Sequence, residues 1–487
     1  MNASLLAPEI GMAALVVVFF LETLGYDCFK RLGGLTIWLS SAVALLAAAS
    51  LGAHGTAFSG CYQVDALSQF FKLAVAFGFA VVTAIGPRPA GVGDEKRPDY
   101  FMLLAISSLG LMLMASAAEL TTMYLALELA SLSLYAVAPL RADSRPAAEA
   151  AVKYILYGAM VTALSLYGLS LIMASQHTTY LSELAAKPWN MTEAPLAILG
   201  MSLYLCGFLF KLALFPFHFW CPDVYQGVGN ETAAFVSTLP KLGALAVLVR
   251  LVGEIGMNAQ TGTALAVLAA LSMTAGNLSA LAQKDLKRLL GFSSVSHAGF
   301  AVMGLVAAGP EGLASAAFYG ICYLLMNLAA FFVVCRLGQG DVNPTLESLN
   351  GLYKRSPGMA FVLLVAAFSL VGLPPTAGFA GKFFLLGSLW GKGHDWLVIV
   401  AVINTAIAIF YYLNMVRHAY TVEPTEQDAQ TQDAQAQAPA GSLLASVALT
   451  PARALLGGGL AVSLLIGGLY PAPLYALAQA AARLTLP

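Results

Sequence analysis

The run GFLFKLALFPFHFWCPDVYQG, residues 207–227, places an amine and an imidazole inside an apolar stretch. Lys211 and His218 stand two helical turns apart, and Pro216 between them interrupts a helix by removing a backbone donor. Burial disfavours the charged form of an amine, so a desolvated lysine can release and regain its proton, whereas arginine stays protonated. The chemistry offered by these residue types is therefore proton transfer.

Further titratable residues recur in other apolar stretches. Glu128 interrupts TTMYLALELASLSLY, and His297 follows Ser293 by one helical turn in GFSSVSHAGF. Glu149 and Lys153 are four residues apart in PAAEAAVKY, where a helix brings them onto one face. Carboxylates, amines and imidazoles spread along a bundle are the composition of an intramembrane proton path. A structural ion pair for Glu149 and Lys153, and a packing role for His297, stay open as alternatives.

The composition indicates that these residues lie in a membrane. Of the 487 residues, 59% are hydrophobic and only 10% are charged, whereas a soluble domain carries about 25% charged residues. Apolar stretches of roughly 20 residues, long enough to cross a bilayer, recur along the chain, and the first of them reads as a span rather than a signal peptide. The net charge of −1 argues against nucleic-acid binding, and the six cysteines show no metal-ligand spacing.

The apolar stretches predict fourteen transmembrane helices. Most Lys and Arg outside them fall on one side of the predicted membrane, and the positive-inside rule then places both termini outside the cytoplasm. The acidic, Gln/Ala-rich segment 421–442 is expected to be a solvated, disordered connector. The predicted spans are 5–24, 35–52, 65–86, 99–117, 119–139, 147–175, 194–214, 230–253, 263–282, 289–308, 312–337, 358–390, 395–420 and 454–482.

The cations left inside these spans, once loops and span ends are set aside, are all lysines. Each costs roughly 2.5–3.5 kcal/mol at the centre of a helix in a bilayer, so several of them require a polar or hydrated interior. Lys72 lies near the start of its span, and we expect it to reach the interface with its long side chain. The five lysines are Lys72, Lys153, Lys211, Lys241 and Lys382.

A second Pro/Gly-rich interruption, GLPPTAGFAGK, precedes Lys382 in the twelfth predicted span. Two interrupted helices in corresponding positions, each with a lysine, are typical of transporters built from inverted repeats. Unwound backbone at that depth is tolerated only where it lines a cavity or is buried in protein. We therefore expect opened carbonyls beside Lys211 and Lys382. The interrupting residues of the twelfth span are Pro374, Pro375 and Gly378.

The long motifs GFLFKLALFPFHFWCPDVYQG, GNLSALAQKDLKRLLGFSSVSHAGF and GLPPTAGFAGKFFLL resemble the antiporter-like membrane subunits of respiratory complex I, most closely the subunit N type. The resemblance implies an all-α polytopic membrane protein of about 14 transmembrane helices. Helices 4–8 and 9–13 would form two inverted five-helix repeats, with helices 7 and 12 broken. The implied divisions are 1–98 (helices 1–3), 99–253 (first repeat), 254–420 (second repeat), 421–453 (acidic flexible connector) and 454–487 (helix 14).

The resemblance also implies a role for each titratable residue. A proton from the cytoplasmic side would reach the seventh-helix lysine, cross to the second repeat and leave on the other side. The fifth-helix glutamate would act as the switch by pairing with that lysine, and the sixth-helix pair would tune the first half. The path residues are Glu128, Lys211, Lys241, His297 and Lys382, and the auxiliary residues are Glu149, Lys153, His218 and Ser293.

The implied function is proton translocation by a subunit of an NADH:quinone oxidoreductase in the bacterial inner membrane. NADH, FMN, iron–sulfur clusters and quinone would be bound by partner subunits and none by this chain, whose neighbours would be other antiporter-like and small membrane subunits. The alternative is a subunit of a cation/proton antiporter without a redox module. The electron donor, the quinone, and proton against sodium stay open. So does the role of Glu231 in GVGNETAAF, where the family reads GAP-x-P after YQG; we favour an interfacial residue over a proton-uptake group.

Overall fold

The computed structural model describes residues 3–25, 34–141, 144–338, 343–421 and 449–483. These residues fold almost entirely into helices, which satisfy most backbone donors and acceptors within their own segment, as a membrane interior requires. In chain order they are α1 (Ala7–Thr23), α2 (Leu35–Ala49), α3 (Ala66–Ile85), α4 (Arg97–Ser116), α5 (Leu120–Val137), α6 (Arg145–Gln176), α7 (Leu181–Leu184), α8 (Pro195–Leu212), α9 (Trp220–Gly227), α10 (Asn230–Ile255), α11 (Ala259–Leu281), α12 (Leu286–Ala307), α13 (Gly309–Leu337), α14 (Leu352–Arg355), α15 (Pro357–Val371), α16 (Ala377–Leu389), α17 (Asp395–Tyr420), α19 (Pro451–Leu469) and α20 (Ala472–Arg483).

The helices confirm a polytopic membrane protein of about fourteen spans. Twelve helices in the described residues are long and apolar enough to cross a membrane. The shorter apolar helix α2 supplies one more span, and α15 and α16 together supply another in two pieces. Residues 422–448, which contain most of the expected connector, lie outside the described part of the chain.

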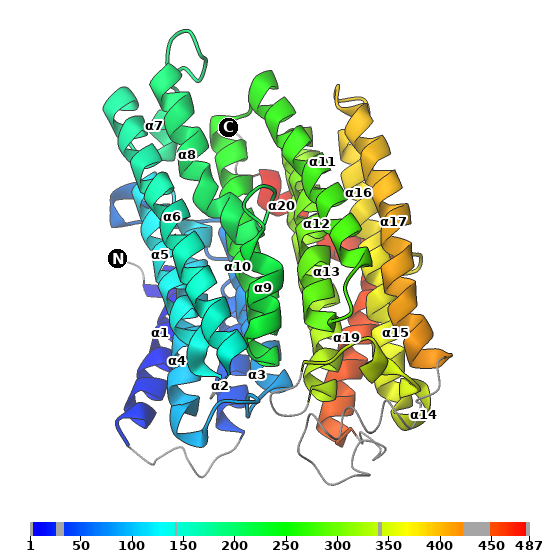
Figure 1. The fold of residues 1–487 in the computed structure, drawn as a ribbon. Coiled ribbons are helices and arrows are strands. Elements are labelled where there is room, and N and C mark those ends of the chain that lie inside the picture. The colour runs from blue at the N-terminus through cyan, green and yellow to red at the C-terminus, as the bar shows by residue number, and fades with distance from the viewer. Residues whose placement is uncertain (1–2, 26–33, 142–143, 339–342, 422–448, 484–487) are drawn as a thin grey trace.

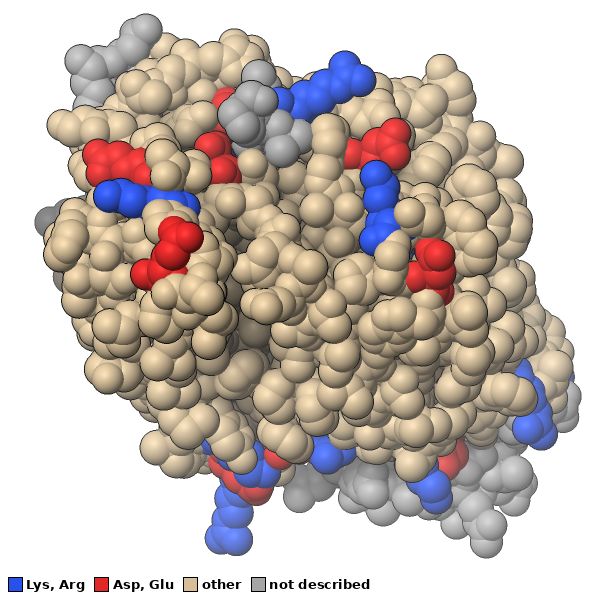
Figure 2. Space-filling view, turned by 90° about the horizontal axis from the view of Figure 1, so that it is seen from above, with Lys and Arg blue, Asp and Glu red and all other residues tan. Residues whose placement is uncertain are grey.

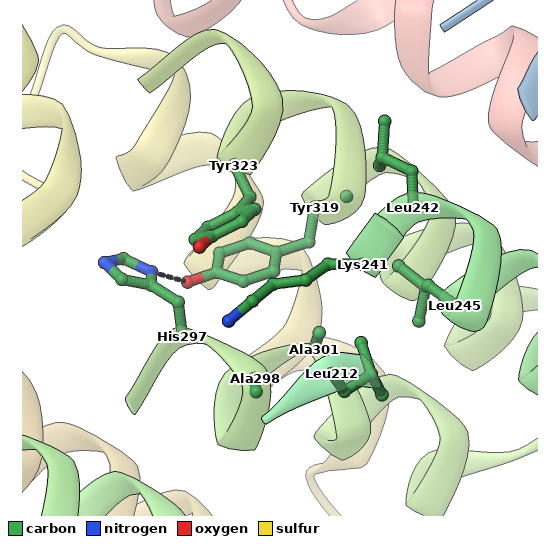
Figure 3. Close-up of a pocket in the computed structure, with 10 residues that line it drawn as sticks. Leu212, Lys241, Leu242, Leu245, His297, Ala298, Ala301, Tyr319 and Tyr323 are labelled. Atoms are coloured by element: carbon green, nitrogen blue, oxygen red, sulfur yellow. Dashed lines mark hydrogen bonds between the residues drawn. The ribbon is translucent and has the colours of Figure 1, made fainter. Parts of the chain in front are cut away.

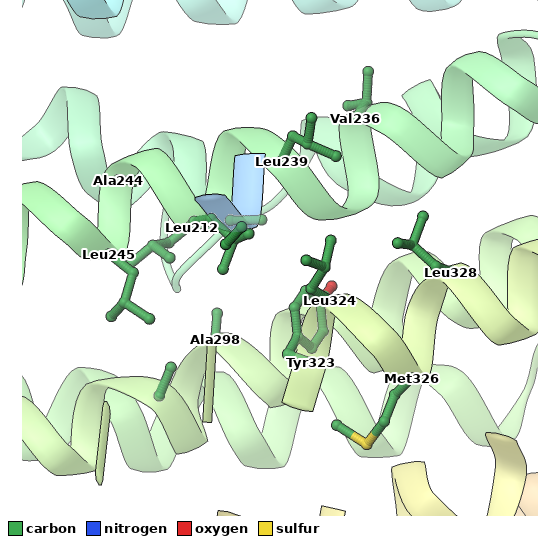
Figure 4. Packing of buried hydrophobic residues seen from close by; sticks show 14 of the residues in the cluster. Leu212, Val236, Leu239, Ala244, Leu245, Ala298, Tyr323, Leu324, Met326 and Leu328 are labelled. Atoms are coloured by element: carbon green, nitrogen blue, oxygen red, sulfur yellow. The ribbon is translucent and has the colours of Figure 1, made fainter. Parts of the chain in front are cut away.

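The spans form two groups that lie side by side (Figure 1). Helices of the first half, coloured blue to green, lie on the left, and those of the second half, green to orange, lie on the right. The most apolar parts of α10, α12 and α13 are 94%, 94% and 89% buried, whereas those of α6, α11 and α17 are 39% buried. Helices that are apolar all round occupy the interior of such a bundle. Figure 4 shows side chains of these central helices packed together.

The two ends of the bundle are named here by the elements that lie at them. We call the end at which α14 lies, at the bottom of Figure 1, the α14 end. Figure 2 looks at the opposite end and shows only a few charged side chains, scattered in small groups. A short antiparallel hairpin of β1 (Gly55–Ala57) and β2 (Tyr62–Val64), which no sequence pattern predicted, precedes α3.

Both predicted interruptions are present. The seventh span ends as α8 at Leu212, turns through Ala213 in a left-handed conformation (φ 59°), and resumes as α9 after Pro216. The twelfth span stops at the end of α15 and resumes as α16 after Pro374 and Pro375. Gly378 was expected to lie in this second break. It lies instead in the first turn of α16, where its backbone N–H donates to Ser369 Oγ at 3.0 Å.

The last predicted span, 454–482, is wrong as a single helix. The structure has two helices, α19 and α20, separated at Tyr470 and Pro471. Proline cannot continue a helix because it lacks the backbone donor and its ring clashes one turn back. The second piece, α20, packs against α13 and α3 rather than extending α19.

Candidate proton-transfer site

Lys211 lies in the last turn of α8 and is 2% exposed. Its ammonium Nζ donates to the hydroxyl of Tyr154 at 3.4 Å and lies 5.5 Å from the ring centre of Tyr135 and 5.4 Å from that of Tyr154. Aromatic faces attract a cation without adding a formal charge. Opened carbonyls were expected beside this lysine, but the Phe210 carbonyl at the break accepts from the indole N–H of Trp220 at 2.9 Å instead.

Glu128 lies on α5 and was expected to pair with Lys211. The structure shows no ion pair between these two described residues, and the buried Oε1 of Glu128 has no hydrogen-bond partner. An unpaired buried carboxylate oxygen is costly unless the group is protonated or moves. The conformation described here is therefore one in which the pair is open.

Glu149 and Lys153 form the expected pair on α6, with Nζ 2.7 Å from Glu149 Oε1. Lys153 also donates to Asp223 Oδ2 on α9 at 2.8 Å, and Asp223 Oδ1 accepts from the Arg288 guanidinium of α12 at 2.5 Å. These residues line a pocket of about 320 Å³ at the α14 end. The pair thus belongs to a larger charged cluster that joins α6, α9 and α12.

Lys241 lies at the middle of α10, facing α12 and α13 (Figure 3). Its Nζ donates to the carbonyl oxygen of Ser294 at 3.2 Å and also to the Ser294 hydroxyl. Ser294 Oγ in turn lies 2.5 Å from the Tyr323 hydroxyl and 3.0 Å from the Tyr225 hydroxyl. Lys241 also lines a cavity of about 20 Å³ with His297, which is enough for one water molecule.

His297 on α12 is bound on both ring nitrogens by tyrosine hydroxyls. Nδ1 lies 2.6 Å from Tyr319 of α13, and Nε2 lies 3.1 Å from Tyr412 of α17. The Tyr412 hydroxyl also bonds the hydroxyl of Ser293. A hydroxyl both donates and accepts hydrogen bonds, so this series of hydrogen bonds can pass a proton in either direction. The predicted neighbours His297 and Ser293 are therefore joined through Tyr412.

Lys382 on α16 fulfils the expectation of opened carbonyls. Its Nζ donates to the carbonyl oxygens of Val371 at 2.9 Å and Leu370 at 3.3 Å, in the last turn of α15. The final carbonyls of a helix have no intrahelical donor, so the break supplies the lysine with acceptors. The same ammonium lies 4.3 Å from the ring centre of Phe300.

His218 lies apart from these groups. It is buried in the connection between α8 and α9, where its ring stacks on Phe215 with ring centres 5.4 Å apart and lies tilted against Phe219 at 4.4 Å. Among the described residues its Nδ1 has no hydrogen-bond partner. It follows Lys211 by two turns in sequence, but the break between α8 and α9 lies between them, and the partners described for the two side chains are different residues. In the described residues no group of three His, Cys, Asp or Glu side chains is arranged to hold a metal ion.

Two interpretations of buried cations were wrong. Lys72 does not reach the interface: it is fully buried and pairs with Glu9 of α1 at 2.7 Å. The cations inside the spans are also not all lysines, because Arg250 is 1% exposed within α10 and holds both oxygens of Asp65 at 2.8 and 3.0 Å. Each carboxylate comes from another part of the chain, so no local pattern revealed the pairs.

Glu231 is buried in the first turn of α10 and does not lie at an interface with water. Its Oε2 accepts from the backbone N–H of Ala90 at 3.3 Å, and a side chain at Gly86 would collide with it. The carboxylate therefore ties the α3–α4 connection to the start of α10.

Comparison with known proteins shows the family to which this chain belongs. A family model described as NADH:quinone oxidoreductase/Mrp antiporter, transmembrane, matches residues 117–408. The NADH-quinone oxidoreductase subunit N 2 of Solidesulfovibrio magneticus is 56% identical over 482 residues, which cover 98% of each chain. The chain belongs to the subunit N family of NADH-quinone oxidoreductases.

Two solved structures share the fold of this chain. A chain of respiratory complex I from Thermus thermophilus with bound aureothin is 32% identical, with a TM-score of 0.81 over 97% of this chain and 99% of that one. A chain of the Mrp complex from Dietzia sp. DQ12-45-1b shares the fold, with a TM-score of 0.85 at 19% identity over 99% of this chain and 97% of that one.

The site of this subunit N family member contains residues that the sequence patterns did not single out. Their signal was weak, because each is a tyrosine, serine or charged residue whose partner lies on another helix. Five of them lie inside a motif quoted for another residue, whereas Tyr319, Tyr323 and Tyr412 lie outside every quoted motif. The full set is Tyr154, Asp223, Tyr225, Arg288, Ser294, Tyr319, Tyr323 and Tyr412.

Proposed function

We propose that this chain is the proton-translocating membrane subunit of an NADH:quinone oxidoreductase, driven by redox chemistry in partner subunits. One observation carries the proposal. Lys211, Lys241 and Lys382 are all buried, and among the described residues none has an ion pair; their acceptors are neutral hydroxyls and carbonyls. By contrast, Lys72 and Arg250 are locked by carboxylates. A lysine held only by neutral acceptors can give up its proton without leaving a carboxylate unpaired.

The same contacts give Lys211, Lys241 and His297 a hydroxyl partner for proton transfer. Lys211 contacts the Tyr154 hydroxyl, Lys241 contacts Ser294, and His297 lies between two tyrosine hydroxyls. Lys241 and His297 also line one water-sized cavity, so a water molecule there would connect them. Lys382 then delivers the proton to the far side through the second break.

Glu128 acts in this proposal as the switch of Lys211. When the two side chains approach, the carboxylate stabilises the charged ammonium; when they separate, as in the described conformation, burial favours release of the proton. Moving one charge against 100 mV costs about 2.3 kcal/mol. That energy must come from outside the chain, which is why we place NADH, FMN, iron–sulfur clusters and quinone in partner subunits.

The proposal includes a position in the cell and in the complex. We place the chain in the bacterial inner membrane, with the α14 end toward the cytoplasm because it carries most of the loop Lys and Arg residues. Helices α4, α5, α6, α8–α9 and α10 form the first inverted repeat, and α11, α12, α13, α15–α16 and α17 form the second. Neighbouring antiporter-like and small membrane subunits are its partners.

The test uses the whole complex in sealed vesicles, with proton uptake and NADH:quinone activity measured together. Replacing Lys211 by Ala, or Glu128 by Gln, is expected to abolish or strongly reduce proton translocation, and Lys211→Arg is expected to fail because arginine keeps its proton. Full pumping by Lys211→Ala would rule the path out, and full pumping by Glu128→Gln as well would rule out the switch.

A cation/proton antiporter is the second candidate, favoured by the fold shared with the Mrp complex. Isolation of the tagged chain in mild detergent separates the two. Material with flavin and iron–sulfur absorbance and NADH:quinone activity supports the oxidoreductase, whereas colourless material that contains only other membrane subunits supports the antiporter.

A further inference from the structure

Two contacts of the short helix α9 connect parts of the molecule that the proposed path treats separately. Trp220, at its start, stacks on Tyr154 with ring centres 4.8 Å apart, and Tyr154 is the residue that contacts Lys211. Tyr225, at its other end, bonds Ser294, the residue that contacts Lys241. Helix α9 therefore touches the immediate surroundings of both lysines.

Asp223 lies between these two contacts on α9 and lines the 320 Å³ pocket. Its carboxylate is shared by one cation from each half of the chain, Lys153 of α6 and Arg288 of α12. Lys153 is shared in turn with Glu149, and Arg288 also donates to Gln226 Oε1 at 3.1 Å. Negative and positive groups thus alternate across the 320 Å³ pocket. Among the described residues that line it, only Asp223 has a carboxylate bonded to both Lys153 and Arg288.

The packing of α9 makes its position sensitive to this carboxylate. A side chain at Gly291 of α12 would meet the backbone of Pro222 at 2.8 Å, and one at Gly227 would meet that of Pro146 at 2.6 Å. The helix is therefore wedged between α6 and α12 at backbone contact. Without the charge of Asp223, Lys153 and Arg288 would face each other as like charges across the wedge, which favours separation of α6 from α12.

We propose that Asp223 is a positioning residue for the proton path. Its ion pairs with Lys153 and Arg288, which we call the latch, hold α9 between the two halves of the bundle. While the latch is formed, protons from the α14 end do not reach Lys211. This inference rests on the proposed function, and it adds a residue and a control point to that function. Release occurs when Lys153 turns from Asp223 to Glu149, which already lies 2.7 Å from its Nζ, so that no charge is left unpaired.

The test measures passive proton leak through the resting complex in vesicles, with an imposed pH gradient and no NADH or quinone. Asp223→Asn keeps the shape but removes the charge, and it is expected to raise the leak severalfold. Asp223→Glu is expected to restore the low leak, since a group that serves only packing would not be rescued by charge. Asp94→Asn is the matched control, because Asp94 pairs with Arg97 within one turn on an exposed surface at the same end.

A second variant shows where the leak runs. In Asp223→Asn combined with Lys211→Ala, the leak is expected to return to the wild-type level, because the released proton needs Lys211. Amide hydrogen exchange of residues 220–227 is expected to be faster in Asp223→Asn than in wild type. If Asp223→Asn fails to assemble, Arg288→Gln takes its place with the same expectations, because it removes the ion pair between Arg288 and Asp223.

The outcomes separate this inference from the proposed function. An assembled Asp223→Asn complex with wild-type leak and wild-type amide exchange would overturn the latch, even if Lys211→Ala stops pumping. Loss of pumping without any leak would also overturn it, because Asp223 would then conduct or support protons rather than hold them back. Normal pumping by Lys211→Ala would overturn the proposed path, whatever the leak.

Discussion

At the scale of single residues, the kind of partner distinguishes the buried cations. Glu9 and Asp65 lock Lys72 and Arg250 in ion pairs, whereas the lysines of the proposed path contact neutral oxygens and aromatic faces. Breaking a buried ion pair costs about 3–5 kcal/mol, which keeps a paired cation charged. A hydroxyl or a carbonyl imposes no such penalty when the lysine loses its proton.

Ser294 offers a test at this scale, because its hydroxyl contacts Lys241, Tyr225 and Tyr323 together. We expect Ser294→Ala to slow proton translocation by up to about 10- to 100-fold, since a hydrogen bond to a charged group contributes about 1.5–3 kcal/mol. Turnover-linked proton uptake in vesicles measures the effect.

The control is Ser296→Ala, two residues along the same helix. Ser296 is equally buried, and no side-chain hydrogen bond of its hydroxyl is found among the described residues. Equal losses in both variants would show that helix packing, and not the hydroxyl, limits the rate.

At the scale of elements, the broken helices place the lysines. The break between α15 and α16 supplies Lys382 with freed carbonyls, and it requires a glycine where the two pieces cross. A Cβ at Gly378 would lie 1.7 Å from the carbonyl oxygen of Ser369, which is backbone and cannot turn aside. The break between α8 and α9 has a different role. The Phe210 carbonyl at this break accepts from Trp220, and α9 is joined to α12 by the bond between Asp223 and Arg288.

Gly378→Ala is therefore expected to push α16 away from α15 and to separate Lys382 from its carbonyls. We expect a lower thermal unfolding midpoint of the complex and reduced pumping. Gly387→Ala, on the same helix with open space around its Cα, is the matched control and is expected to be neutral or slightly stabilising, since alanine favours a helix by roughly 0.5–1 kcal/mol. Equal stability of the two variants would contradict the crossing argument.

At the scale of the whole molecule, two buried ion pairs join the first helices to the central bundle. Glu9 of α1 binds Lys72 of α3 and accepts from the Tyr62 hydroxyl at 2.6 Å, and Asp65 before α3 binds Arg250 of α10. Burial alone would raise the pKa of the Asp65 carboxyl, but the Arg250 guanidinium and the hydrogen bonds from Ser68 hold that pKa below its ordinary value. This connection is therefore charge-dependent.

The sign of its pH dependence follows. A carboxyl whose pKa is lower in the folded state stabilises the fold at pH values above its unfolded pKa, about 3.9, and that contribution is lost as the pH falls through the folded pKa. Asp65→Asn keeps a residue that caps α3 but removes the charge. We expect its unfolding midpoint to lie below that of wild type at neutral pH, and the gap to shrink in acid. A gap that does not change with pH would show that the charge of Asp65 contributes nothing.

The sequence by itself indicated that the chain lies in a membrane, where most of its spans run, and where the seventh and twelfth spans are broken. The length of an apolar run can be compared directly with the thickness of a bilayer, and a proline removes a backbone donor wherever it stands. Both signals can therefore be read from a short stretch of sequence. The motifs also led to the family, which the comparisons confirm. The two pieces of the last span had a local signal as well, at Pro471, but the apolar run on both sides outweighed it.

Only the tertiary structure decided which charges are partners. Lys72 and Arg250 have carboxylates that lie 63 and 185 positions away along the chain, and Asp223 collects cations from two helices distant in sequence. A hydrogen bond acts over about 3 Å, whereas a helix period reports only neighbours within one or two turns. The roles of the path residues stay predictions, because a proton path is a set of contacts between helices, and those contacts exist only once the bundle has packed.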